Sequence, residues 1–204
     1  HLGEVGSTME HKFPGKNRFE RGFADIQTSG KGRKGAEWVT DSEGIAATWS
    51  IASMSGLSPG ILQIGVGAEL SAAFNMHLKW PNDIVDMSYR KCGGVLSSLQ
   101  GDGRVMIGVG MNRYEQRIPG LETTGWDSSL PSLSKSTAFC VADAAVASAL
   151  DSHPTIGVPN SENLRNSAWK QISKVLSRGY GAIVDGVDVR IAGVEENGEI
   201  MFSG

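Results

Sequence analysis

Apolar residues along the chain fall into short runs that alternate with turns rich in glycine and polar residues. The run at 44–54 is apolar and partly β-branched, which is typical of a buried strand. The runs at 91–99 and 105–111 are joined by Gly-Asp-Gly, which predicts a β-hairpin. Strands are therefore predicted at 22–26, 44–54, 77–80, 91–99 and 105–111.

Helices are predicted in three places. Pro59 suits the first turn of a helix that runs to about residue 75, with apolar residues recurring near helical spacing behind it. The segment 138–150 is rich in alanine and typical of a core helix, and 160–176 predicts a further helix. Between them, residues 114–136 are rich in Pro, Gly and Ser and predict a long loop.

The last segment, from residue 179 on, has a different character. Its short apolar runs surround Glu-Asn-Gly at 196–198, which is a hairpin turn signal. We therefore predict a main domain at 1–177 and a small β appendage at 178–204. Because helices mix with hairpins and show no βαβ rhythm, the predicted fold class is α+β.

Composition narrows the classes of function. With 204 residues, 40% of them hydrophobic, the chain is long enough to bury a core. Its net charge of −3 argues against a general nucleic-acid binder, so we expect no nucleic-acid partner. Cys92 and Cys140 show neither metal-ligand spacing nor a disulfide framework, which indicates a reducing compartment. No apolar run reaches the roughly 18 residues of a membrane span, so we expect a cytoplasmic protein with no membrane partner.

The segment GKGRKG at 30–35 is the most informative part of the sequence. Glycines bring backbone N–H groups close to a ligand, and the interleaved cations add charged donors. Arg33 can offer a planar fork to a carboxylate or phosphate. Taken by itself the segment also fits a solvated basic loop, so its interpretation depends on the rest of the chain.

Three further motifs carry candidate chemistry. In KWPND at 79–83, Asn82 and Asp83 follow a strand; the pair fits a polar turn, a nucleotide and metal site, or a receiver of an attacking amine. Lys91 precedes two glycines at a strand start, where it is either a solvated edge residue or a ligand-binding cation. The strand at 107–112 ends in small residues and an amide side chain.

In this order and spacing, the motifs resemble those of the biotin protein ligases. The matching features are Ser7-Thr8, the glycine and basic loop at 30–35, KWPND at 79–83, K-x-x-G at 91–94 and G-x-G-x-N at 108–112. The resemblance implies a mixed sheet packed with helices, of the class II synthetase-like kind, and a tail similar to the family's SH3-like domain. Because only six residues precede Ser7, we expect ligase activity without the DNA-binding repressor role of some relatives.

The resemblance also implies the site residues. The biotin-binding residues would be Ser7, Thr8, Gln27, Gly30, Lys31, Gly32, Arg33, Lys91 and Gly94. The ATP-binding residues would be Arg33, Trp38, Asn82, Lys91 and Asn112. The catalytic residues would be Arg33, Lys91 and Asp83.

Within these sets the resemblance implies distinct roles. Ser7, Thr8 and Gln27 would bind the ureido head of biotin, and Trp38 would pack on adenine. Lys91 would bind the biotin carboxylate and the α-phosphate. Arg33 would hold the acyl-adenylate, and Asp83 would lie where the acceptor lysine arrives.

The implied reaction is the ATP-dependent activation of biotin to biotinyl-5'-adenylate and its transfer to a lysine, with release of pyrophosphate and AMP. The expected partner is a biotin carboxyl carrier domain of a carboxylase, and a homodimer is possible. Magnesium would arrive as MgATP, and no metal-binding residues are assigned. Two alternatives stay open: a lipoate or octanoate ligase of the same superfamily, and a non-catalytic biotin-binding module.

The chain departs from the family pattern at three positions. Lys31 stands where arginine is frequent, so the charge is kept and the bidentate fork is lost. Met9 replaces a common asparagine, and Ala36 replaces a residue that is basic in some relatives. These departures concern the contacts with biotin and phosphate rather than the reaction.

Overall fold

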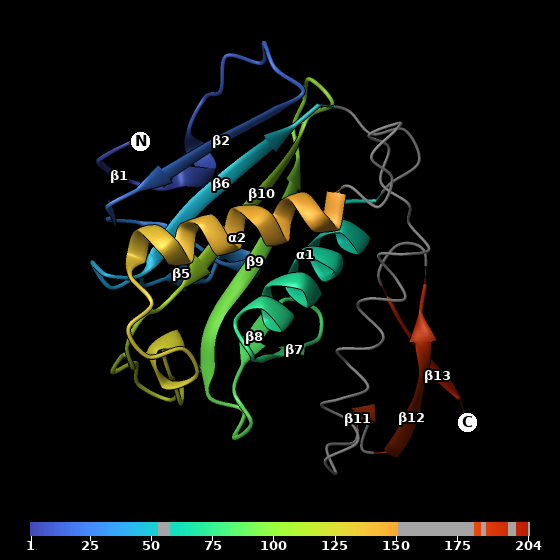
Figure 1. The fold of residues 1–204 in the computed structure, drawn as a ribbon. Helices are drawn as coiled ribbons and strands as arrows, with labels where there is room; N and C mark the ends of the chain where they lie inside the picture. The colour runs from blue at the N-terminus through green and yellow to red at the C-terminus, as the bar shows by residue number, and fades with distance from the viewer. Residues whose placement is uncertain (53–57, 151–181, 185–186, 196–198, 204) are drawn as a thin grey trace.

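A six-stranded antiparallel sheet with two helices on one face forms the body of the protein (Figure 1). The structure is a computed structural model, and it describes residues 1–52, 58–150, 182–184, 187–195 and 199–203. The strand order is β2-β6-β10-β9-β8-β7. These strands are β2 (Phe19–Ala24), β6 (Ile45–Ile51), β7 (His77–Lys79), β8 (Asp83–Val85), β9 (Lys91–Leu99) and β10 (Val105–Met111).

The remaining elements are shorter or lie outside the sheet. Among the described residues, the helices are α1 (Pro59–Ala73) and α2 (Lys135–Leu150), with the 3₁₀ helices η1 (Thr8–Glu10), η2 (Arg33–Gly35) and η3 (Trp126–Ser128). Four short strands pair in twos: β1 (Glu4–Val5) runs parallel to β3 (Ile26–Gln27), and β4 (Gly30–Lys31) runs antiparallel to β5 (Glu37–Trp38).

Both helices have clear start signals. At α1, the Ser58 hydroxyl accepts a hydrogen bond from the Ile61 N–H at 3.2 Å, and Pro59 occupies the first turn as predicted. At α2, the Ser134 hydroxyl accepts from the Thr137 N–H at 3.2 Å. Helix α2 therefore starts three residues before the predicted position 138, because its first turn is polar and carries no apolar period.

The strand predictions were confirmed for β6, β7, β9 and β10, and the β9–β10 hairpin turns through Gly103 at φ 83°. Strand β2 begins earlier than the predicted 22–26. Strand β8 was missed, because Asp83 looked like part of a turn when it is the first residue of a strand.

Strand β10 has two unlike faces, which sets the layout of the molecule. Ile107, Val109 and Met111 are buried in the core cluster with residues of α1 and α2. The alternate positions Gly108 and Gly110 lie on the opposite face of the pleated strand. The helices therefore cover one face of the sheet, and the other face is left with little side-chain bulk along this strand.

The tail forms an antiparallel sheet of β11 (Ala182–Val184), β12 (Val187–Val194) and β13 (Ile200–Ser203), as the small β appendage predicts. The α+β fold class is confirmed. The predicted helix at 160–176, the boundary near 177 and the turn at 196–198 lie outside the described residues, so the two-unit division stays a prediction. Within the described ranges, no helix is long and apolar enough to cross a membrane.

Removing the Ile107 side chain should destabilise the fold. Ile107 is fully buried, and Ile107→Ala should lower the free energy of unfolding by about 2–5 kcal/mol, because it leaves a cavity in the core. Urea denaturation measures this change. Leu99→Ala, at a position 63% exposed at the end of β9, is the control and should change stability by less than about 0.5 kcal/mol. Equal effects of the two variants would contradict this assignment of the core.

Candidate functional site

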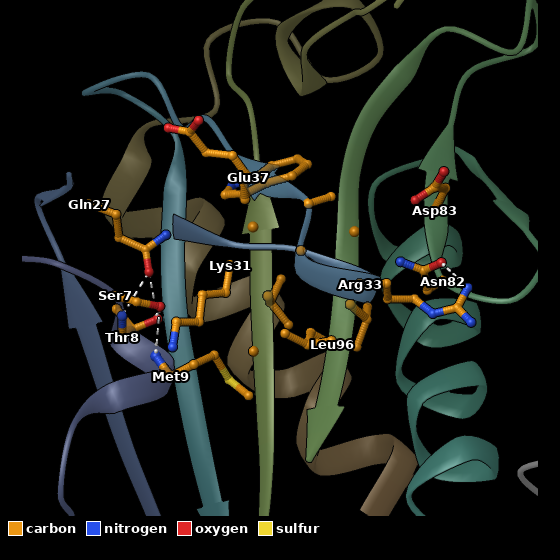
Figure 2. Close-up of a pocket in the computed structure, with 18 of the residues that line it drawn as sticks. Ser7, Thr8, Met9, Gln27, Lys31, Arg33, Glu37, Asn82, Asp83 and Leu96 are labelled. Atoms are coloured by element: carbon orange, nitrogen blue, oxygen red, sulfur yellow. Dashed lines mark hydrogen bonds between the residues drawn. The ribbon is translucent and has the colours of Figure 1, made fainter. Parts of the chain in front are cut away.

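A cavity of about 260 Å³ lies on the face of the sheet opposite the helices (Figure 2). It brings together most of the predicted site residues, from segments far apart in the sequence. Its lining consists of Ser7, Thr8, Met9, Gln27, Lys31, Gly32, Arg33, Ala36, Glu37, Trp38, Asn82, Asp83, Lys91, Gly94, Val95, Leu96, Gly108, Val109 and Gly110. Of the predicted residues, Gly30 and Asn112 do not line it.

Glycines form the floor of the cavity. A Cβ built at Gly108 would lie 2.6 Å from the Met9 sulfur, and one at Gly110 would overlap the Trp38 indole. Trp38 and Met9 therefore rest directly on the backbone of β10. Any larger residue at these two positions would displace them.

One end of the cavity carries a chain of hydrogen bonds (Figure 2). The Thr48 hydroxyl donates to the Thr8 hydroxyl oxygen at 2.8 Å, and the Thr8 hydroxyl donates to Gln27 Oε1 at 3.0 Å. The Thr8 N–H donates to the same Gln27 oxygen at 2.8 Å. Because Oε1 is held twice, the Gln27 amide is fixed in orientation, with its Nε2 donor beside Gly30. This end suits a ligand group that both accepts and donates hydrogen bonds.

Gly30 matters because it has no side chain. A Cβ there would overlap the Trp38 carbonyl and lie 3.1 Å from Gln27 Nε2. Gly30 is thus required for the pairing of β4 with β5 and for the position of the Gln27 amide, although it does not line the cavity itself.

The segment predicted as a glycine-rich loop is an ordered hairpin, residues 30–38, that crosses in front of the sheet (Figure 2). Its tip closes through the Gly32 N–H, which donates to the Ala36 carbonyl at 2.7 Å. Lys31 forms an ion pair with Glu10 at 2.5 Å, and Arg33 donates to Asn82 Oδ1 at 3.3 Å. Each of these two cations therefore ties the hairpin to a different wall of the cavity.

The second end of the cavity is cationic. Lys91 Nζ lies 2.7 Å from Asp83 Oδ1, and the two side chains are 22% and 26% exposed. The same ammonium lies 5.6 Å from the centre of the Trp38 ring, within cation–π range. Arg33 reaches Asn82, the neighbour of Asp83 in the KWPND turn. The arrangement suits an anionic ligand group, for which Lys91 would exchange its present carboxylate partner.

Asn112 lies next to the cavity rather than on its surface. It follows β10, is 2% exposed, and its N–H donates to the Cys92 carbonyl at 2.8 Å. Its Oδ1 has no hydrogen-bond partner among the described residues. A buried unpaired acceptor is costly, so this amide is a candidate to bind a donor or cation of a ligand.

Cys92 is excluded as a nucleophile. Burial raises the pKa of its thiol far above the ordinary value, and the negative charge of Asp86 raises it further. The thiol thus stays protonated at neutral pH, and its sulfur lies 3.5 Å from the Asn112 carbonyl oxygen. Its role is to pack in the core.

Oxygen ligands at the cationic end fit magnesium that arrives with phosphate. Asp83 offers a carboxylate, and Asn82 offers an amide oxygen. In the described part of the chain, no three or more His, Cys, Asp or Glu side chains are grouped so that they could hold a metal ion. This donor set agrees with Mg²⁺, which is commonly held by one or two carboxylates together with substrate phosphates.

Several lining residues escaped the sequence interpretation. Met9 was noted only as a departure from a pattern, and Leu96 and Glu37 carried no motif. Gly108 and Gly110 did carry a signal, since two glycines at alternate positions of one strand leave one face bare. Leu96 could have been placed from pairing, because it lies opposite Gly108 in the β9–β10 hairpin.

Comparison of structures identifies the fold. A biotin protein ligase from Aquifex aeolicus, solved in complex with biotin and ATP, is 22% identical with a TM-score of 0.67, over 98% of this chain and 89% of that one. A biotin protein ligase from Leishmania major, in complex with biotinyl-5-AMP, is 20% identical with a TM-score of 0.66, over 98% and 92% of the two chains. The chain has the fold of biotin protein ligases.

Comparison of sequences points the same way over a shorter stretch. No model of a protein family matches the chain. The biotin–[acetyl-CoA-carboxylase] ligase of Paracoccus denitrificans is 29% identical over 103 residues, which cover 44% of this chain and 42% of that protein. The match therefore spans less than half of that relative. The resemblance to biotin protein ligases that the motifs indicated is confirmed.

A methyl group on the cavity floor should move the indole of Trp38. Gly110→Ala should shift the side-chain N–H signal of Trp38 in an NMR spectrum, because the new Cβ would overlap the ring. The Trp38→Phe variant assigns this signal. Gly101→Ala, where a Cβ meets nothing within 4 Å, is the control and should leave it in place. An unmoved signal in Gly110→Ala would show that Trp38 does not rest on β10.

Proposed function

We propose that the protein is an ATP-dependent biotin protein ligase, which forms biotinyl-5'-adenylate and transfers biotin to a lysine of a carrier domain. The observation that supports this most is the division of one cavity into two chemically different ends. Thr8 and Gln27 form a hydrogen-bonding end that suits the cyclic urea of biotin. Lys91 and Arg33 form a cationic end that suits a carboxylate beside a phosphate.

The first step joins two anions, so it needs fixed positive charge. The biotin carboxylate oxygen attacks the α-phosphorus of ATP, and the bond to the β-phosphate breaks with loss of pyrophosphate. Lys91 would bind both the carboxylate and the α-phosphate, which would offset their repulsion and the charge that develops at phosphorus. Mg²⁺ supplied with ATP would neutralise charge on the departing pyrophosphate.

The Lys91–Asp83 pair suggests how one site can serve both steps. At 2.7 Å each group neutralises the other. When Lys91 binds the adenylate, Asp83 loses this partner and can orient the amine of the acceptor lysine. The amine nitrogen then attacks the acyl carbon, the amide bond forms, AMP leaves, and the amine loses its proton.

The hairpin at 30–38 would protect the adenylate from water. It crosses the sheet in front of the cavity and is tied to both walls by Lys31 and Arg33. Excluding water strengthens the electrostatic interactions inside the cavity and slows hydrolysis of the activated acid. Arg33 is the hairpin residue beside the cationic end, so we assign it the retention of the adenylate.

Lys31 and Met9, which depart from the family pattern, lie in the cavity lining. Lys31 is paired with Glu10, so its charge also serves to hold the hairpin. Met9 covers Gly108 at the hydrogen-bonding end and supplies an apolar wall there. This wall would contact the apolar ring of biotin next to its ureido edge. Asn112 would act on the nucleotide side through its unpaired oxygen.

The partner, the assembly and the domain division belong to the same proposal. The acceptor would be a biotin carboxyl carrier domain that presents one exposed lysine to the Asp83 end of the cavity. A homodimer is compatible with the fold. The sheet of β11, β12 and β13 would be a small C-terminal subdomain at 178–204, after a catalytic domain at 1–177.

Mass spectrometry of the adenylate tests the activity. The protein is incubated with MgATP and equal amounts of biotin and lipoate, and the bound small molecules are analysed. We expect biotinyl-adenylate as the main product. Lipoyl-adenylate would assign the protein to the lipoate ligases instead, and the absence of both adenylates would favour a non-catalytic biotin-binding module.

Lys91→Ala should lower adenylate formation by at least about 100-fold, because it removes the cation that meets both anions. The rate is followed as pyrophosphate release in the presence of biotin. Lys16→Ala, which removes an exposed lysine that does not line the cavity, is the matched control and should keep the rate of the unaltered protein. A near-normal rate for Lys91→Ala would refute the role given to Lys91.

A further inference from the structure

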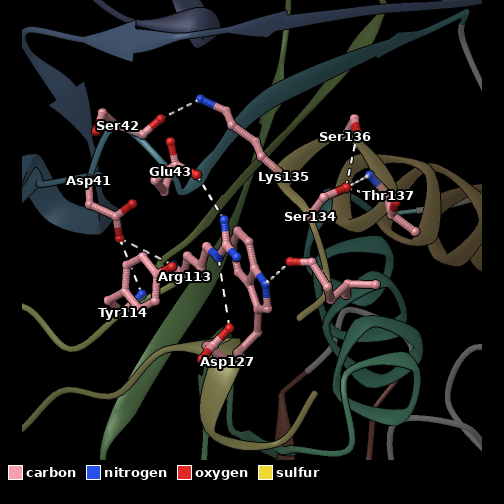
Figure 3. A network of polar contacts seen from close by, with 12 residues as sticks. Asp41, Ser42, Glu43, Arg113, Tyr114, Asp127, Ser134, Lys135, Ser136 and Thr137 are labelled. Atoms are coloured by element: carbon pink, nitrogen blue, oxygen red, sulfur yellow. Dashed lines mark hydrogen bonds and ion pairs between the residues drawn. The ribbon is translucent and has the colours of Figure 1, made fainter. Parts of the chain in front are cut away.

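The end of β10 is held between two segments of the chain (Figure 3). On one side, a Cβ at Gly44 would lie 2.7 Å from the Met111 carbonyl oxygen. On the other side, a Cβ at Gly125 would overlap the backbone of Arg113. Two glycines therefore allow the turn at 41–44 and the segment at 123–128 to lie directly on the backbone that follows the strand.

Asp41 makes the side-chain contact at this point (Figure 3). Its Oδ2 accepts from the Arg113 N–H at 3.1 Å, from the Tyr114 N–H at 3.5 Å and from the Gln116 side-chain amide at 3.1 Å. The carbonyl of Asp41 accepts from the Gly44 N–H at 3.0 Å, which closes the turn. One carboxylate thus binds three donors from the chain that leaves β10.

The backbone groups of Asn112 and Arg113 differ in what holds them. The Asn112 N–H donates to Cys92 at 2.8 Å, and the Asn112 carbonyl accepts from Trp126 at 3.0 Å. The Arg113 carbonyl accepts from Asp127 at 3.1 Å. These three bonds are backbone to backbone, whereas the Arg113 N–H is held by a side chain, that of Asp41.

The Arg113 side chain extends the same network (Figure 3). Its Nη1 lies 2.8 Å from Glu43 Oε2, and its Nε lies 3.8 Å from Asp127 Oδ1. It is 18% exposed, so its charge is partly shielded from water. The turn that holds Asp41 and Glu43 is therefore joined to η3 through a single arginine.

The network connects the two parts of the nucleotide side. Trp38 lies three residues before Asp41, at the end of the hairpin, and Asn112 comes directly before Arg113. Asn112 has a buried oxygen without a partner among the described residues, so its aim depends on the backbone that carries it. Asp41 contacts that backbone and fixes the chain that carries Trp38.

We propose that Asp41 is a positioning residue for nucleotide binding, which sets Trp38 and Asn112 relative to each other through the backbone at 112–114. This inference rests on the proposed function, because it takes the Trp38 and Asn112 side as the place of ATP. Asp41 does not line the cavity, and its Oδ2 is engaged by the chain that follows β10, so it acts through that chain. Its loss leaves the Arg113 N–H without this partner and lets the strand end shift.

Asp41→Ala should therefore weaken ATP binding by about 10-fold, while biotin binding stays within about twofold of the unaltered protein. Isothermal titration calorimetry with a non-hydrolysable ATP analogue, and separately with biotin, measures both. Asp41→Asn keeps an oxygen that accepts from the Arg113 N–H and should restore most of the ATP affinity. Asp102→Ala is the matched control, since Asp102 also accepts a backbone N–H, from Arg104 at 3.0 Å in the β9–β10 turn.

Equal weakening of both ligands in Asp41→Ala would overturn the inference, because it would show a general structural role. Unchanged ATP affinity, or no recovery in Asp41→Asn, would overturn it as well. Failure of the proposed function is separate from these results. It would be seen in the unaltered protein as ATP binding without formation of an adenylate, and the ratio of ATP to biotin affinity would still decide the role of Asp41.

Discussion

Strand β10 has two unlike faces, and both the helical layer and the cavity follow from this difference. Ile107, Val109 and Met111 bind the strand to the helical layer, and Gly108 and Gly110 leave its other face bare. A sheet packed on both faces would have no room for a ligand, and a sheet packed on neither would not be stable. In β10, large apolar residues alternate with glycines, so one face packs on the helices and the other leaves room for a ligand, because successive side chains point to opposite faces.

Three cations line the cavity, and each contacts a polar or acidic side chain. Lys91 is held by Asp83, Arg33 by Asn82 and Lys31 by Glu10. None of the three cations is therefore a buried charge without a partner, a state that would destabilise the fold. The hydrogen-bonded Thr8 and Gln27 need no such compensation, because they are neutral.

The side of the cavity that we propose for the nucleotide is held by contacts that lie outside the cavity. Trp38 ends β5 and Asn112 follows β10, so the two are far apart in the sequence. Each precedes a segment that Asp41 and Arg113 join to its neighbours. Fixed backbone is a precondition for a site that must hold reacting groups in place. The glycines at 44 and 125 matter here because they let three segments meet at one point.

The α+β class, the β9–β10 hairpin and helix α1 could be predicted from the sequence alone, because hydrophobic periodicity and turn chemistry are local properties of the chain. The motif residues from Ser7 to Lys91 were predicted from a resemblance to biotin protein ligases. The sequence could not show that the glycine-rich segment is an ordered hairpin, that Asp83 starts a strand, or that Lys91 pairs with Asp83. Gly30 and Asn112, which the resemblance placed among the ligand contacts, do not line the cavity. These points required the folded structure, because they depend on contacts between residues distant in sequence, which no local pattern encodes.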